Sequence, residues 1–98
     1  MRKVLISNLV VSKMEDLESY LIFELQLSEE ASLKRSNRMR MFVSSLSKAA
    51  DYPLCRFRKW KKLKYRCAVF ERDWVFAYEL FDEGIIVRDM SHTSLLKE

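Results

Sequence analysis

The sequence predicts an α+β fold: an N-terminal strand, then a two-helix hairpin packed on one face of a twisted antiparallel sheet of three to five strands. Apolar residues recur at helical spacing in the first half of the chain, and β-branched and aromatic residues gather in short runs in the second half. The chain has 98 residues with one Gly and one Pro, so we expect a single domain of regular elements with short connections.

The first predicted element is a short apolar strand at residues 4–7, and a helix is expected to follow it. Ser12 and Glu15 have the spacing of a capping box, in which each side chain accepts a hydrogen bond from the backbone amide of the other residue. We therefore expect the first helix to begin at Ser12. Its apolar face consists of residues at helical spacing, namely Met14, Leu17, Leu21 and Leu25.

A second helix is expected after Ser28, because Glu29 and Glu30 place negative charge in its first turn, where that charge favours the helix dipole. The two helices are nearly contiguous and should form an αα-hairpin. The predicted buried stripe of the second helix consists of Met39, Phe42, Val43, Leu46 and Ala50. Its cations, which should face solvent or a partner, are Lys34, Arg35, Arg38 and Arg40.

Residues 51–53 end the helical pattern, and β-rich runs follow. The predicted strands are residues 55–59, 64–70, 74–81 and 85–90. Turns are expected at residues 72–73 and 83–84. Two-residue loops at these turns would place Glu79 opposite Arg66 in one hairpin and opposite Arg88 in the next, with His92 opposite Val75.

This register divides the sheet into a charged face and an apolar face. The charged face would carry Arg66, Glu79, Arg88 and His92, with Ala68 and Ala77 as small neighbours. The apolar face, which should cover the helices, would carry Tyr65, Cys67, Val69, Trp74, Phe76, Tyr78, Leu80, Ile85 and Val87. Asp89 does not fit that apolar face, so we expect it near the sheet edge or in a bulge.

The middle third of the chain is strongly basic. Residues 34–66 contain twelve Lys/Arg and one acid, whereas residues 1–33 and 67–98 have net charges of −3 and −4. Such density suits the neutralisation of phosphates, and the interleaved aromatic residues can stack on unpaired bases. A solvated sheet face is the alternative interpretation. The predicted nucleic-acid ligands are Arg56, Arg58, Lys59, Lys61, Lys62 and Lys64.

His92 is the single histidine of the chain, and histidine is the side chain that titrates nearest to neutral pH. Arginines beside it would hold a phosphate or stabilise a phosphorane. The predicted catalytic set is therefore His92, Arg66, Arg88 and Glu79, in a geometry suited to RNA cleavage through the 2′-hydroxyl. Opposite charges across strands are also an ordinary sheet pairing, which is the structural alternative.

Cys55 and Cys67 have no zinc-binding spacing, and one histidine leaves a structural zinc site short of ligands. We expect two free, reduced thiols, and neither a metal nor a cofactor. No apolar stretch approaches the length of a membrane span, and the N-terminal stretch is interrupted by charges. The chain is therefore expected to be cytoplasmic.

The whole order of elements resembles the RelE/ParE superfamily of bacterial type II toxins, along nearly the full length of the chain. The closest part is residues 74–92, which look like the family's strand, acidic turn and strand that ends in a basic residue or histidine. The resemblance implies a toxin that a cognate antitoxin neutralises. It also implies one of two actions: ribosome-dependent cleavage of mRNA, or inhibition of DNA gyrase.

Two departures from the family pattern bear on this choice. The arginine that commonly precedes a tyrosine in the ribonuclease branch corresponds to Val75 here, so Arg66 or Arg88 would have to replace it. His92 carries over, whereas the tyrosine that often follows it does not. The favoured expectation is an endoribonuclease acting in the ribosomal A site. A noncatalytic gyrase toxin and a non-toxic RNA-binding or interaction module are the alternatives.

Overall fold

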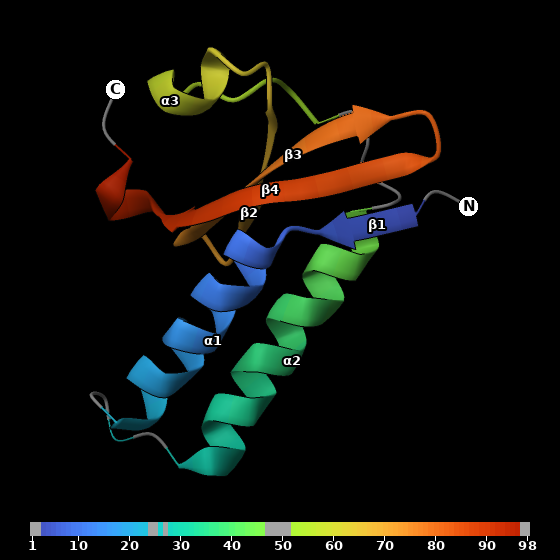
Figure 1. The fold of residues 1–98 in the computed structure, drawn as a ribbon. Coiled ribbons are helices and arrows are strands. Elements are labelled where there is room, and N and C mark those ends of the chain that lie inside the picture. Colours follow the sequence, from blue (N-terminus) through green and yellow to red (C-terminus); the bar gives the residue numbers. More distant parts are fainter. Residues whose placement is uncertain (1–2, 24–25, 27, 47–51, 97–98) are drawn as a thin grey trace.

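The computed structural model describes residues 3–23, 26, 28–46 and 52–96 (Figure 1). In chain order its elements are β1 (Lys3–Ile6), α1 (Asn8–Phe23), α2 (Glu29–Ser45), α3 (Arg58–Lys61), β2 (Arg66–Phe70), β3 (Trp74–Phe81), β4 (Gly84–His92) and the 3-10 turn η2 (Thr93–Leu95). The strands form one sheet in the order β1-β4-β3-β2. The fold is therefore α+β, as predicted.

The sheet is mixed, and not antiparallel throughout as predicted. β1 pairs in parallel with β4, from Lys3 opposite Gly84 to Ile6 opposite Val87, while β2, β3 and β4 pair antiparallel. A long connection that contains helices is what allows two strands to run parallel. Within the part of the chain that the structure describes, no helix is long and apolar enough to span a membrane.

The start of the second helix was predicted correctly, and that of the first was not. Ser28 is the N-cap of α2, and its Oγ accepts a hydrogen bond from the amide of Ala31 at 3.1 Å. α1 begins at Asn8, four residues before the predicted start at Ser12. The Oγ of Ser7 accepts from the amide of Val10 at 3.3 Å, so the cap lies directly after β1 and Ser12 is inside the helix.

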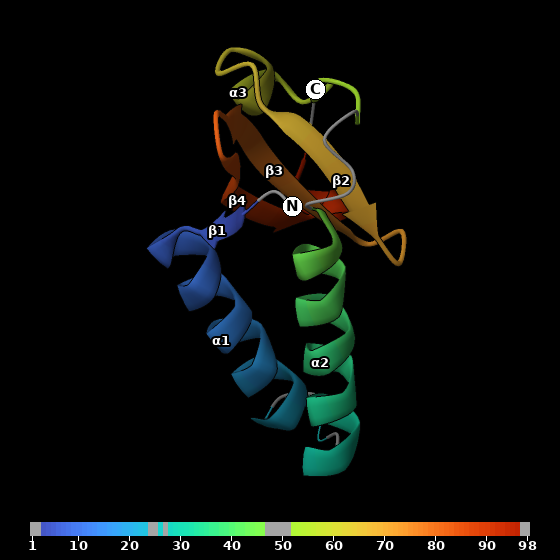
Figure 2. The same cartoon turned by 90° about the vertical axis from the view of Figure 1, so that its right-hand side faces the viewer.

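Helices α1 and α2 form a hairpin that stands on one face of the sheet (Figure 2). The buried core between the hairpin and the sheet consists of Val10, Met39, Val43, Leu46, Ala68, Phe70, Phe76, Tyr78, Ile85, Val87 and Met90, with Phe42 and Trp74 packed against it. This confirms most of the predicted stripe of α2. Ala50 and Leu25 lie outside the described residues, as does the side chain of Leu21. Lys34, Arg38 and Arg40 are exposed as predicted, whereas Arg35 is half-buried.

The opposite face of the sheet is covered by residues 52–65, which we call the basic cap. Trp60 in the cap is 2% exposed and packs with Cys55, Val75 and Ala77 in a second core. The strand predicted at residues 55–59 is wrong, because residues 58–61 form α3 and only Leu54 bridges to β2. Burying the large Trp60 side chain outweighs the strand propensity of the segment.

A disulfide joins Cys55 to Cys67, with the two Cα atoms 5.0 Å apart, so the prediction of free thiols is wrong. The pairing depends on the cap folding back along β2. The amide of Cys55 donates to the carbonyl of Tyr65 at 2.8 Å, and the amide of Cys67 donates to the carbonyl of Pro53 at 3.3 Å. The disulfide and these hydrogen bonds together hold the cap on the sheet.

The predicted register of the first hairpin is wrong by one residue. Its loop has three residues, 71–73, so Arg66 lies opposite Tyr78 and not opposite Glu79. Glu71 and Arg72 adopt positive φ angles of 48° and 69° to close this turn. A shift of one residue moves a side chain to the other face of a strand. Arg66 and Ala68 therefore leave the face that carries Ala77 and Glu79.

The second hairpin turns at residues 82–83, one residue earlier than predicted, and contains a β-bulge. Tyr78 lies opposite Val87 and Ala77 lies opposite Asp89, so no β3 residue lies directly opposite Arg88 in the register. His92 consequently lies opposite Trp74 and not opposite Val75. Asp89 follows the bulge directly, in keeping with the position expected for it.

Gly84 lies tightly against the backbone of β1. A Cβ atom at this position would lie 2.0 Å from the backbone oxygen of Lys3, which cannot move without shifting β1. We expect Gly84→Ala to lower the free energy of unfolding by about 3 kcal/mol, the upper range for overpacking. Urea denaturation measures this, with Glu83→Ala in the same exposed turn as the control. Equal denaturation midpoints for the glycine variant and wild type would contradict the observed pairing.

Candidate functional site

The structure does not bring the four predicted catalytic residues together. Glu79 and Arg88 lie on the capped face, with Arg88 Nε 2.7 Å from Glu79 Oε2. His92 lies opposite Trp74 and thus on the hairpin face, since Trp74 packs against the hairpin core. Arg66 donates to the carbonyl of Tyr52. Of the predicted contacts among the four, the Glu79–Arg88 pair is the one that forms.

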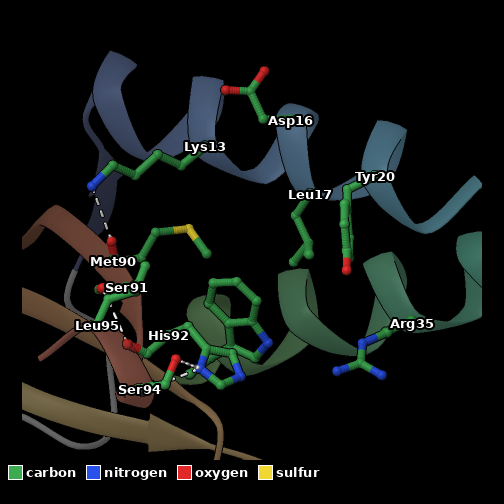
Figure 3. A pocket seen from close by; sticks show the side chains of 11 residues that line it. Lys13, Asp16, Leu17, Tyr20, Arg35, Met90, Ser91, His92, Ser94 and Leu95 are labelled. Carbon is green, nitrogen blue, oxygen red and sulfur yellow. Dashed lines mark hydrogen bonds between the residues drawn. The ribbon is translucent and has the colours of Figure 1, made fainter. Parts of the chain in front are cut away.

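His92 lines an open pocket of about 690 Å³ between the helical hairpin and the C-terminal end of β4 (Figure 3). The other polar lining residues are Lys13, Asp16, Tyr20, Arg35, Ser91 and Ser94. The apolar lining residues are Leu17, Trp74, Met90 and Leu95. We call this cavity the His92 pocket. Its volume lies within the range usual for sites that bind small ligands.

Ser94 fixes the hydrogen-bonding role of the His92 ring. The Ser94 amide donates to Nδ1 at 3.1 Å, so the neutral ring carries its hydrogen on Nε2. Ser94 Oγ lies 2.8 Å from the same nitrogen and can accept from it when the ring is protonated. Nε2 therefore carries a hydrogen in both states. In this tautomer His92 donates a hydrogen bond from Nε2 and does not act there as a base. Proton donation from Nε2 starts from the protonated ring and leaves the hydrogen on Nδ1, where Ser94 Oγ can accept a hydrogen bond from it.

Arg35 and Lys13 differ in what they offer the pocket. The Nε atom of Arg35 is buried and has no hydrogen-bond partner among the described residues. Lys13 is already engaged, because its Nζ donates to Asp89 Oδ1 at 2.6 Å and to the Met90 carbonyl at 3.1 Å. Sequence reasoning missed Arg35 and Tyr20 as site residues, since their approach to His92 depends on how the hairpin sits on β4.

The predicted nucleic-acid ligands gather on the basic cap. All six cations, Arg56, Arg58, Lys59, Lys61, Lys62 and Lys64, are exposed. Among the described residues, no acid lies within ion-pair distance of any of them. Four of them, Arg56, Arg58, Lys61 and Lys62, line a hollow of about 410 Å³. Their charge is therefore free to meet an external anion.

The basic cap and the His92 pocket meet at the C-terminal segment. A second hollow, of about 320 Å³, is lined by Arg58, Lys59 and Lys62 of the cap together with Leu95. Leu95 also lines the His92 pocket. The cap hollow and the His92 pocket therefore adjoin each other at the Leu95 side chain.

Asp89 ties the two faces of the sheet together. β1 pairs with β4 only as far as Val87, so the edge of β4 is open at Asp89 and Lys13 reaches it from α1. Trp60 Nε1 of the cap donates to the other carboxylate oxygen at 3.1 Å. Burial acts to raise the pKa of Asp89, but hydrogen bonds from Lys13, the Met90 amide and Trp60 outweigh it and hold the pKa below its ordinary value of 3.8.

This lowered pKa predicts the pH dependence of stability. The Asp89 contribution is complete above the unfolded-state pKa of about 3.9 and is lost as the pH falls through the lower folded-state pKa. We expect Asp89→Asn to cost about 1–3 kcal/mol at neutral pH and to flatten the acid limb of a stability profile from pH 7 to pH 2. Asp82→Asn, in an exposed turn, is the control. An acid limb that stays unchanged in the Asp89 variant would argue against the anchor.

Neither a scan against models of protein families nor a search of curated proteins finds a match to this chain. Within the described ranges, no group of three or more His, Cys, Asp or Glu side chains is placed to hold a metal ion. The site is therefore interpreted from its own geometry.

Proposed function

We propose that this chain is the toxin of a type II toxin–antitoxin pair, acting as a ribosome-dependent mRNA endoribonuclease that a cognate antitoxin neutralises. The observation that carries the proposal is the meeting of the basic cap with the His92 pocket at Leu95. The cap would supply sequence-independent affinity for RNA phosphates, and the pocket would present the His92 ring to the bound strand. The resemblance of residues 74–92 to the RelE/ParE superfamily supports the same conclusion.

In such a cleavage, the 2′-oxygen attacks the phosphorus and the bond to the 5′-oxygen breaks. The protonated His92 ring is suited to the acid half of this reaction: Nε2 gives its proton to the departing 5′-oxygen, and Ser94 Oγ accepts a hydrogen bond from the hydrogen left on Nδ1. Arg35 lines the same pocket and is suited to stabilise the negative charge on phosphorus. Glu79, which was expected either to orient the arginines or to serve as the base, lies on the opposite face, so water or a ribosomal group would accept the 2′-hydroxyl proton.

A noncatalytic toxin that inhibits DNA gyrase is the second candidate. It is favoured by the separation of Glu79 and Arg88 from His92, because a gyrase inhibitor needs no catalytic set. Two assays on the purified chain separate the candidates: mapping of transcript ends on translating ribosomes, and gyrase supercoiling. New ends at ribosome-occupied codons support the endoribonuclease. Loss of supercoiling without cleavage supports the gyrase toxin. If neither activity is found, the non-toxic binding module is the remaining candidate.

The basic cap predicts how RNA affinity responds to charge removal. Replacing Lys61, Lys62 and Lys64 with glutamine should weaken RNA binding and lower the slope of log K against log salt by about 2, at roughly 0.7 per phosphate contact with a single strand. The melting temperature should barely change, because exposed cations contribute little stability. Filter binding at several salt concentrations measures the slope.

A matched triple variant removes the same charge elsewhere on the surface. Lys3, Lys34 and Arg40 are exposed cations outside the cap, each within 4 Å of a glutamate carboxylate. Their replacement by glutamine should leave the salt dependence of RNA binding close to that of wild type. Equal losses in the two triple variants would show that net charge, and not the cap, determines RNA binding.

A further inference from the structure

The geometry points to the His92 pocket as a site for one nucleotide, with its phosphate on Arg35 and its base against the apolar wall that includes Trp74. This inference deepens the proposed function and rests on it for the RNA that carries the nucleotide. The location differs from the predicted catalytic face, because two of the residues invoked, Tyr20 and Arg35, come from the helical hairpin.

Hydrogen-bond donors dominate the polar lining of the pocket. Figure 3 shows Arg35 projecting from α2 toward the side where His92 lies, while the Asp16 carboxylate points away from the other lining side chains. His92 offers Nε2–H, Tyr20 its hydroxyl and Arg35 its guanidinium. Asp16 is the one acid among the described lining residues, and its carboxylate does not face Arg35. Such a set selects an anion.

The unsatisfied Nε of Arg35 is a second, independent indication of a ligand. A buried donor without a partner costs about 1–3 kcal/mol and is rare in native structures. A phosphate oxygen would remove that cost, because guanidinium groups bind phosphate through two parallel hydrogen bonds. The Arg35 guanidinium, which lines the pocket, thus keeps hydrogen-bonding capacity that the described residues leave unused.

The apolar wall indicates a base in addition to the phosphate. Trp74 is half-buried and is held edge-on to His92, with ring centroids 5.2 Å apart and planes at 86°. Leu17, Met90 and Leu95 extend this surface. Stacking of a base on an aromatic side chain contributes about 1–3 kcal/mol, which a phosphate ion alone cannot gain. The continuity with the cap through Leu95 makes the nucleotide part of a bound RNA strand.

NMR titration of the full chain tests the inference, with the four nucleoside 5′-monophosphates and inorganic phosphate as probes. The two tryptophans are internal reporters: Trp74 lines the pocket, and Trp60 is buried on the other face of the sheet. We expect at least one nucleotide to shift the Trp74 indole and Arg35 Nε–H signals but not the Trp60 indole. Its affinity should exceed that of inorganic phosphate by about tenfold or more, the equivalent of 1.4 kcal/mol.

Variants of α2 identify the anion ligand. Arg35→Gln should weaken nucleotide binding by about tenfold or more, because charge-assisted hydrogen bonds contribute this much. Arg35→Lys keeps the charge and should retain part of the affinity. Arg38→Gln, on the same helix but paired with Glu71, is the matched control and should bind like wild type. Equal nucleotide affinity of Arg35→Gln and wild type overturns the inference, as does equal affinity for phosphate and all four nucleotides.

Failure of this inference is distinguishable from failure of the proposed function. Ribosome-dependent cleavage without nucleotide shifts at Trp74 overturns the pocket assignment and leaves the endoribonuclease intact. Nucleotide binding without cleavage supports the pocket and counts against the endoribonuclease. The Lys61/Lys62/Lys64 variant should lose RNA affinity but keep mononucleotide affinity, and a parallel loss of both would place the nucleotide on the cap instead.

Discussion

If the chain is the proposed endoribonuclease, replacing His92 with glutamine is expected to lower the rate of ribosome-dependent mRNA cleavage by about 10² to 10⁴, the usual contribution of a general acid. Glutamine has a similar size and still offers an N–H donor, but it cannot give up a proton. The loss should therefore appear in the single-turnover rate, while RNA affinity stays near that of wild type. Cleavage of a defined message on purified ribosomes measures both.

The fold should tolerate this change, because His92 lies at the end of β4 near the C-terminus. Arg72→Ala, in the exposed turn between β2 and β3, is the control and should cleave at the wild-type rate. If His92→Gln cleaves as fast as wild type, His92 is at most a hydrogen-bond donor to the nucleotide. The noncatalytic gyrase toxin would then become the better candidate function.

Replacing Trp60 with alanine is expected to lower the free energy of unfolding by about 3–5 kcal/mol, as for other buried tryptophans. Trp60 packs edge-on against Phe57, with centroids 5.9 Å apart, and its indole N–H bonds Asp89. The variant thus loses the second core and the polar anchor together. For a domain of this size, the melting temperature should fall by more than about 10 °C. RNA affinity should fall too, because the cations lose the framework that holds them in one patch.

Two variants separate the parts of this effect. Trp60→Phe keeps most of the packing and removes the hydrogen bond to Asp89, so it should cost less than the alanine variant. Phe23→Ala removes an aromatic side chain that is 76% exposed and should hardly change the melting temperature. A Trp60→Ala protein that melts like wild type would mean that the cap is not packed on the sheet.

Local signals in the sequence were enough to predict the positions of several helices and strands. Ser28 with its two following acids located the start of α2, and the alternating run at residues 74–81 located β3 to the residue. These patterns act over a few neighbouring residues, so no knowledge of the rest of the chain is needed to interpret them. The exposed cations of the cap were likewise predictable, because their density does not depend on the fold.

The register of the strands could not be predicted from the sequence, because a single additional loop residue changes which residues lie opposite each other. A three-residue loop at 71–73, in place of two, moved Arg66 off the face of Glu79, and the bulge at Arg88 left His92 on the hairpin face. Side chains alternate with a period of two, so each single-residue change exchanges the faces. The predicted set of four could not be corrected without seeing the turns.

The sequence by itself determined the α+β class, the helical hairpin and the density of positive charge, because composition and periodicity specify these directly. Only the tertiary structure decided that residues 58–61 form a helix whose Trp60 is buried, that Cys55 forms a disulfide with Cys67, and that Arg35 shares a pocket with His92. Each of these depends on contacts between segments distant in sequence. The free energy of burying apolar surface between such segments outweighs the local propensities, which are all that the sequence shows directly.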